Sequence, residues 1–119
     1  MGLDREWMRG AAPLAVMTLL ADGEMYGYEL VEALEARSGG LLEMGQSTVY
    51  PLLYTLEKKG HLAPHWRQAD SGRRRKYYRL TAEGRAWMNE QRGQFERLVT
   101  ALRRLGDSGS GAPEPAEAP

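Results

Sequence analysis

The sequence contains no cysteine and only two histidines, His61 and His65. Without cysteine the chain forms no disulfide, has no thiolate nucleophile and offers no cysteine-ligated zinc site. Two histidines without a carboxylate cluster beside them are too few for a metal site, so we expect both to be surface or structural residues. Paired carboxylates, a nucleophile motif and a phosphate-binding loop are also missing. The sequence therefore argues against an enzyme and predicts neither a cofactor nor a metal.

The sequence also lacks a long hydrophobic run. Its longest apolar stretch, residues 11–21, is interrupted by Pro13 and Thr18, and it is far shorter than the roughly 20 residues that span a bilayer. The first residues include Asp4 and Glu6 and carry no apolar segment typical of a signal peptide. We therefore expect a cytoplasmic protein with no membrane contact.

Net charge is absent as well, because 16 basic side chains balance 16 acidic ones. The two signs are nevertheless separated along the chain. Residues 1–57 carry nine acidic and three basic side chains, whereas residues 58–79 carry eight basic side chains and one acidic side chain. A polyanion responds to such a local patch and not to the average over the chain, so the neutral total does not exclude nucleic acid.

Hydrophobic periodicity predicts four helices and one β-hairpin in a chain long enough for a single domain. Turn residues separate them: Asp22-Gly23, Gly39-Gly40, Gly60 at a C′ position, and the cluster 69–72 at the tip of the hairpin. The predicted helices cover residues 4–20, 26–38, 46–59 and 81–105, and the predicted strands cover 62–68 and 75–80.

This order predicts a mainly α fold with a small β-hairpin, arranged as a winged helix-turn-helix over residues 1–80. Residues 81–105 are predicted to form a C-terminal dimerisation helix, and residues 106–119 a disordered acidic tail without large apolar side chains. Apolar residues in the last helix recur at alternating spacings of three and four, which is typical of a short coiled-coil seam. The predicted dimerisation residues are Met88, Gln91, Phe95, Leu98, Leu102 and Leu105.

The third helix and the hairpin carry the residues expected to bind DNA. The apolar residues Val49, Leu52, Leu53 and Leu56 predict the buried stripe of that helix, which leaves hydroxyl and ammonium groups on the opposite face. A helix of this kind fits the major groove, and the tip of the hairpin, predicted at residues 71–76, brings its cations to neighbouring phosphates. The predicted DNA-binding residues are Ser47, Thr48, Tyr50, Tyr54, Thr55, Lys58, Arg73, Arg74, Arg75 and Lys76.

Three separate blocks of the sequence resemble the signature blocks of the PadR family of transcription regulators. They are YGYEL (26–30), STVYPLLYTLEKKGHL (47–62) and GRRRKYYRLTAEG (72–84). The resemblance covers about residues 5–105. It implies a dimeric winged-helix repressor that binds double-stranded DNA at an inverted repeat. It also places Tyr50 and Lys76 at positions that touch the DNA backbone. The short last helix is similar to that of compact family members.

Some compact members of that family bind flat aromatic drugs in a pore at the dimer interface. The resemblance places Trp7, Gly10, Leu14, Phe95 and Val99 at pore positions, which implies a small aromatic ligand as an effector. An aromatic residue such as Phe95 at a heptad position is, however, more typical of plain core packing, and so is Trp7. A second interpretation of the whole chain also stays open, a winged-helix module that binds protein partners without a ligand or an operator of its own.

Overall fold

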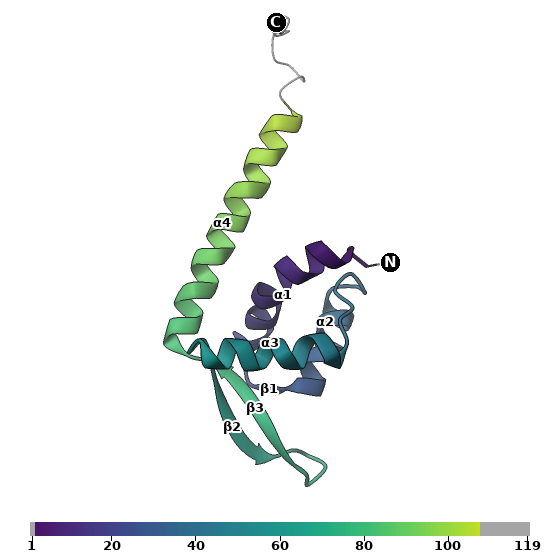
Figure 1. Ribbon diagram of the computed structural model, residues 1–119, viewed down its shortest axis with the longest axis vertical. Coiled ribbons are helices and arrows are strands. Elements are labelled where there is room, and N and C mark those ends of the chain that lie inside the picture. Colours follow the sequence, from purple (N-terminus) through teal and green to yellow (C-terminus); the bar gives the residue numbers. More distant parts are fainter. Residues whose placement is uncertain (1, 108–119) are drawn as a thin grey trace, which may run out of the picture.

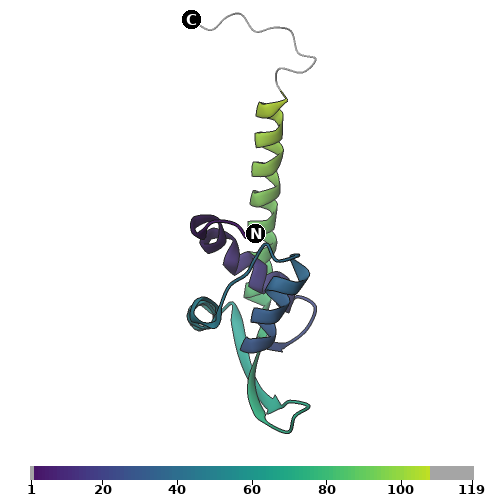
Figure 2. The ribbon, with the colours of Figure 1, turned by 90° about the vertical axis from the view of Figure 1, so that its right-hand side faces the viewer.

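The computed structural model describes residues 2–107 of the chain (Figure 1). The prediction of a mainly α fold with a small β-hairpin is confirmed. Three helices form a compact body, a hairpin projects from it, and a long last helix extends away from it (Figures 1 and 2). The elements are α1 (Arg5–Leu20), β1 (Met25–Tyr26), α2 (Gly27–Arg37), α3 (Gln46–Lys58), β2 (Leu62–Gln68), β3 (Arg74–Leu80) and α4 (Ala82–Gly106).

The body is held together by apolar side chains from α1, α2 and α3. α1 begins where Asp4 accepts a hydrogen bond from the backbone N–H of Trp7 at 3.2 Å, as a helix N-cap does. Val16 and Met17 of α1 are fully buried, and they belong to the same cluster as Leu30 of α2. Full burial of such a side chain stabilises the fold by about 1.5–3 kcal/mol.

The sheet has three strands in the order β1-β3-β2, where the sequence predicted only a hairpin. The added strand pairs Met25 with Tyr78 and Tyr26 with Tyr77. Two residues are too few to show the alternation that identifies a strand, and Tyr26 also serves as the N-cap of α2. This short strand ties the hairpin to the body on the N-terminal side of α2.

α3 begins after Gly45 and ends in a Schellman motif at Gly60. The N–H of Gly60 donates to the carbonyl of Glu57 and the N–H of His61 donates to that of Leu56, both at 3.0 Å. Gly60 has a φ of 83°, a left-handed conformation that glycine adopts at little cost. The predicted C′ glycine is therefore confirmed, and it directs the chain from α3 into β2.

The first turn of α4 is anchored to the same corner. Thr81 caps the helix through the N–H of Gly84, and its hydroxyl donates to the carbonyl of Gly60 at 2.6 Å. The N–H of Thr81 also donates to the carbonyl of His61 at 3.1 Å. The end of α3 and the start of α4 are therefore fixed to each other.

Only the beginning of α4 belongs to the core. Met88 is 4% exposed and packs within its own chain, so its assignment to the dimerisation seam needs correction. Beyond it the helix leaves the body and exposes Phe95, Leu98, Leu102 and Leu105. The predicted tail lies outside the described residues, apart from the end of α4 and its C-cap, Asp107. Within residues 2–107 no helix is long and apolar enough to cross a membrane.

Candidate nucleic-acid interface

The outward face of α3 is polar and aromatic, as the sequence predicted. Val49, Leu53 and Leu56 are buried, and the six residues predicted to bind DNA from this helix are all exposed. Tyr54 is 59% exposed, and the ammonium group of Lys58 lies 5.4 Å from the centre of its ring. The exposed set comprises Ser47, Thr48, Tyr50, Tyr54, Thr55 and Lys58.

Tyr50 occupies the flank of α3 that faces α2. A Cβ atom placed on Gly27 would lie only 2.6 Å from the Tyr50 ring, so this ring rests directly on the first residue of α2. Glycine at position 27 permits this close approach, because any larger residue there would displace the Tyr50 ring. The first two signature-like blocks of the sequence, around Gly27 and Tyr50, therefore meet in space.

The hairpin formed by β2 and β3, called the wing below, ends in a tight turn. The N–H of Ala69 donates to the carbonyl of Arg73 at 2.8 Å, and Gly72 has a φ of 88°. Arg73 and Arg74 are exposed at this end of the wing. Arg75 is partly buried because its guanidinium lies 4.6 Å from the centre of the Tyr26 ring. The two exposed arginines are therefore the cations most accessible to a polyanion at the tip.

Lys76 does not belong to the wing tip, contrary to the prediction. Its ammonium group lies 3.1 Å from a carboxylate oxygen of Glu57, which projects from α3. Burial by itself lowers the pKa of Lys76, but the Glu57 carboxylate and the Tyr78 hydroxyl more than offset this and raise it above the ordinary value. The ion pair between Lys76 and Glu57 therefore connects the wing to α3.

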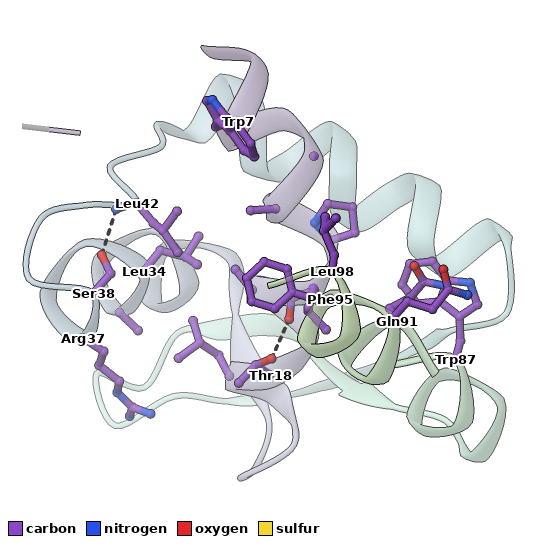
Figure 3. Close-up of a pocket in the computed structure, with 18 of the residues that line it drawn as sticks. Trp7, Thr18, Leu34, Arg37, Ser38, Leu42, Trp87, Gln91, Phe95 and Leu98 are labelled. Carbon is purple, nitrogen blue, oxygen red and sulfur yellow. Dashed lines mark hydrogen bonds between the residues drawn. The ribbon is translucent and has the colours of Figure 1, made fainter. Parts of the chain in front are cut away.

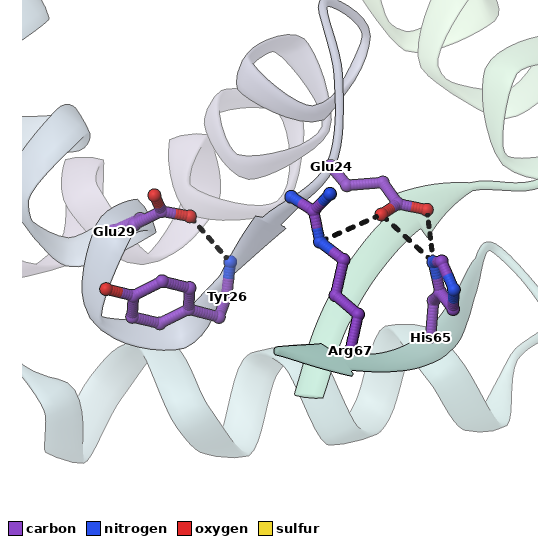
Figure 4. A network of polar contacts seen from close by, with 5 residues as sticks. All are labelled: Glu24, Tyr26, Glu29, His65 and Arg67. Carbon is purple, nitrogen blue, oxygen red and sulfur yellow. Dashed lines mark hydrogen bonds and ion pairs between the residues drawn. The ribbon is translucent and has the colours of Figure 1, made fainter. Parts of the chain in front are cut away.

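The opposite face of the wing is tied to the body by Glu24, in the turn that follows α1 (Figure 4). One carboxylate oxygen of Glu24 lies 2.9 Å from Nδ1 of His65, and the other lies 3.8 Å from Nε of Arg67. The Arg67 guanidinium also lies 3.8 Å from the centre of the Tyr77 ring. His65 is thus a structural residue, as expected, and the wing is held on both faces.

The arrangement of α2, α3 and the wing is that of a winged helix-turn-helix, which is a DNA-binding fold. Residues 16–90 match the model of the transcriptional regulator PadR-like family. The chain belongs to this family. A transcriptional regulator of Mycobacterium tuberculosis is 39% identical over 95 residues, which cover 80% of this chain and 85% of that protein.

Solved structures agree with this PadR-like assignment. A PadR family transcriptional regulator from Eggerthella lenta is 34% identical with a TM-score of 0.74, and the match covers 87% of this chain and 88% of that one. A Streptococcus transcriptional regulator is 28% identical with a TM-score of 0.77, over 87% and 99% of the two chains. These relatives are named as regulators and not as enzymes. The PadR-like chain is accordingly a transcriptional regulator.

A second feature lies away from the wing, between α1, α2 and α4. It is a cavity of about 1010 Å³ whose side chains are mostly apolar (Figure 3). Four of the five predicted pore residues line it, namely Trp7, Gly10, Leu14 and Phe95. Val99 does not line the cavity in the single chain. Gly10 adds room, because a Cβ atom there would meet nothing within 4 Å.

The cavity includes aromatic and polar residues that the sequence reasoning missed. Trp87 lines one side, where its ring stacks on His61 with centroids 5.0 Å apart. Trp87 does not follow the predicted seam, although its place within two turns of the Thr81 cap could have indicated that it packs against the body. Gln91, assigned to the dimerisation seam, and Gln94 supply amide groups in the lining. Phe95 is 56% exposed and Trp7 is 66% exposed.

Proposed function

We propose that two copies of this PadR-like regulator bind double-stranded DNA at an inverted repeat and repress transcription sterically. The observation that carries the proposal is the exposed hydroxyl and aromatic face of α3 beside the arginines of the wing. In a symmetric dimer, two such helices enter major grooves about one helical turn apart. The long apolar edge of α4 supports dimerisation, because Phe95, Leu98 and Leu102 are exposed in the single chain.

The base-reading role falls to α3 and the phosphate-binding role to the wing. Ser47, Tyr54 and Lys58 lie along the exposed face of α3 from its first turn to its last residue, where they can reach base edges or phosphates. Thr48 and Thr55 flank them, and Tyr50 sits beside the wing. Arg73 and Arg74 bring two cations per subunit to the neighbouring phosphates, and Arg75 and Lys76 add charge closer to the body.

A charge-reversal experiment tests this proposal. We expect Arg73→Glu/Arg74→Glu to abolish binding to a duplex selected from a random pool, measured by fluorescence anisotropy. Arg75 stays unchanged because it stacks on Tyr26. The matched control is Arg85→Glu/Arg104→Glu, which reverses the same number of exposed arginines on α4. The assigned role of the wing would be refuted if both variants lost binding to the same extent, or if neither variant lost binding.

The same experiment separates DNA binding from the alternative of a protein-interaction module. Such a module would bind no selected duplex, and reversal of the wing arginines would leave its binding to protein partners unaffected.

A milder pair of substitutions, Arg73→Gln/Arg74→Gln, tests phosphate binding by the wing. A plot of the logarithm of the binding constant against the logarithm of the salt concentration should become shallower by roughly 0.9 for each phosphate that the protein no longer neutralises. A salt dependence that is unchanged by this substitution would contradict phosphate binding by the wing.

We further propose that the cavity between α1, α2 and α4 binds a small, flat aromatic effector. Phe95 and the two tryptophans supply ring faces for stacking, and the amides of Gln91 and Gln94 supply polar contacts. An occupant would change how α4 lies against the body. A change of this kind favours a dimer geometry whose half-site spacing no longer matches the DNA, which releases the repressor.

Dye binding provides the test of the effector site. A planar aromatic dye should quench tryptophan emission, because Trp7 and Trp87 line the cavity. Phe95→Ala should weaken this binding, whereas Val99→Ala should leave it unchanged because Val99 does not line the cavity. Equal effects of the two substitutions would overturn the assignment of the cavity as the ligand site.

A further inference from the structure

Trp66 is an exposed aromatic residue in the middle of the wing. It is 54% exposed on β2, opposite Lys76 of β3 in the strand register. Two positions further toward the tip, Gln68 lies opposite Arg74. Because alternate residues of a strand share one face, Trp66, Arg74 and Lys76 all lie on the same face of the wing.

This face of the wing turns toward α3. Lys76 reaches Glu57 of α3, and Tyr50 of α3 lines a cleft of about 400 Å³ with Trp66. The cleft is also lined by three consecutive cations, Arg74, Arg75 and Lys76. The cleft therefore lies between the exposed face of α3 and the wing. Figure 2 shows how these elements are arranged, with α3 seen end-on and the hairpin projecting below it.

The chemistry of the cleft fits one kind of occupant. Its cations make it positive, and the carboxylate that pairs with Lys76 belongs to Glu57 and is not part of the lining. The Arg74 guanidinium lies 5.7 Å from the centre of the Trp66 ring, so a charge and an aromatic surface are presented together. The indole N–H of tryptophan is a donor only, and an ionised phosphate oxygen accepts hydrogen bonds. The sugar-phosphate backbone of a duplex supplies such an oxygen beside an apolar sugar.

We propose that Trp66 binds the sugar-phosphate backbone of DNA in this cleft, with its indole N–H donating to a phosphate oxygen. This inference rests on the proposed binding of DNA by α3 and the wing. It adds an uncharged residue to the wing, whose DNA-binding residues the sequence had defined only as cations. Trp66 lies between the wing tip and α3, so its contact fixes the distance between the phosphate bound by Arg74 and the groove entered by α3.

The test compares Trp66→Ala and Trp66→Phe with the wild-type protein on one selected duplex, by fluorescence anisotropy at several salt concentrations. Trp66→Ala should weaken binding about tenfold or more, as expected when a hydrogen bond to a charged group is removed. Trp66→Phe keeps a ring but lacks the N–H, so it should recover only part of the loss. The salt dependence should stay unchanged in both, because no cation is removed.

Leu41→Ala is the matched control, since Leu41 is also an exposed large apolar residue but lies between α2 and α3, outside the wing and outside the lining of the cavity. It should leave DNA binding unchanged, and the change in tryptophan emission on adding duplex should disappear only in the Trp66 variants. Circular dichroism establishes that the variants are folded. If Trp66→Ala binds as tightly as wild type while Arg73→Glu/Arg74→Glu does not bind, the role of Trp66 is refuted and the DNA interface stands. If the wild-type protein binds no duplex, both proposals fail.

Discussion

Gly84 offers the sharpest test of how α4 is joined to the DNA-binding body. It is buried in the first turn of α4, and its backbone N–H donates to the capping hydroxyl of Thr81 at 2.9 Å. A Cβ atom on Gly84 would overlap the carbonyl oxygen of His61 and lie 2.9 Å from the carbonyl carbon. Both neighbours are backbone atoms of the turn that follows α3, so neither can move aside as a side chain would.

The expected cost of Gly84→Ala follows from two opposing effects. Forcing an extra methyl group into a packed site costs about 1–3 kcal/mol. In the opposite direction, the higher helix propensity of alanine raises the free energy of unfolding by up to about 1 kcal/mol, and by less in the first turn of a helix. We therefore expect a net loss of roughly 2 kcal/mol in the free energy of unfolding. In a domain of this size such a loss lowers Tm by about 4–8 °C for each kcal/mol.

Thermal unfolding followed by circular dichroism measures the effect, with all variants at one protein concentration so that association does not bias Tm. Gly93→Ala is the matched control on the same helix, because a Cβ atom there would meet only the Arg97 guanidinium at 3.6 Å. It should be as stable as wild type or more stable, by up to about 1 kcal/mol. A Tm for Gly84→Ala at or above that of wild type would refute the close packing of α4 on the end of α3.

Three further predictions concern the core, the cap of α1 and the edge of α4. Met88→Ala should lower the free energy of unfolding by about 2–5 kcal/mol, because the side chain is buried in its own chain; a change well below this range in urea unfolding would place it outside the core. Asp4→Ala should cost about 0.5–2 kcal/mol because the N-cap is removed, and Asp4→Asn, which retains an acceptor, should recover most of this in the same assay. Leu102→Glu should shift the protein toward monomer in sedimentation experiments, because Leu102 is exposed on the apolar edge of α4; an unchanged sedimentation coefficient would argue against this edge as the dimer contact.

Helix positions and local caps were predictable from the sequence because their determinants are close together in the chain. The buried stripe of α3, with Val49 and Leu53, follows from helical spacing alone. Gly60 follows from the preference for glycine where a helix ends in a left-handed residue. The capping role of Thr81 is equally local, since its partner Gly84 lies three residues away.

Contacts between distant elements were not predictable in the same way. Lys76 was assigned to the wing tip because it ends a run of cations, but its partner Glu57 lies on another element. Met88 fits the spacing of the dimerisation seam, yet the first turns of α4 pack on the body before the helix leaves it. Trp66 was missed because a single aromatic residue in a short strand carries no sign of which face meets α3.

The central claim is that two copies of α3 and the wing together bind a symmetric DNA site. The most direct test is selection of bound sequences from a random duplex pool, followed by footprinting of the enriched site. We predict an inverted repeat with half-site centres about 10 bp apart, or a multiple of that spacing, protected on both halves. Enrichment of a site without two-fold symmetry, or no enrichment at all, would contradict this claim.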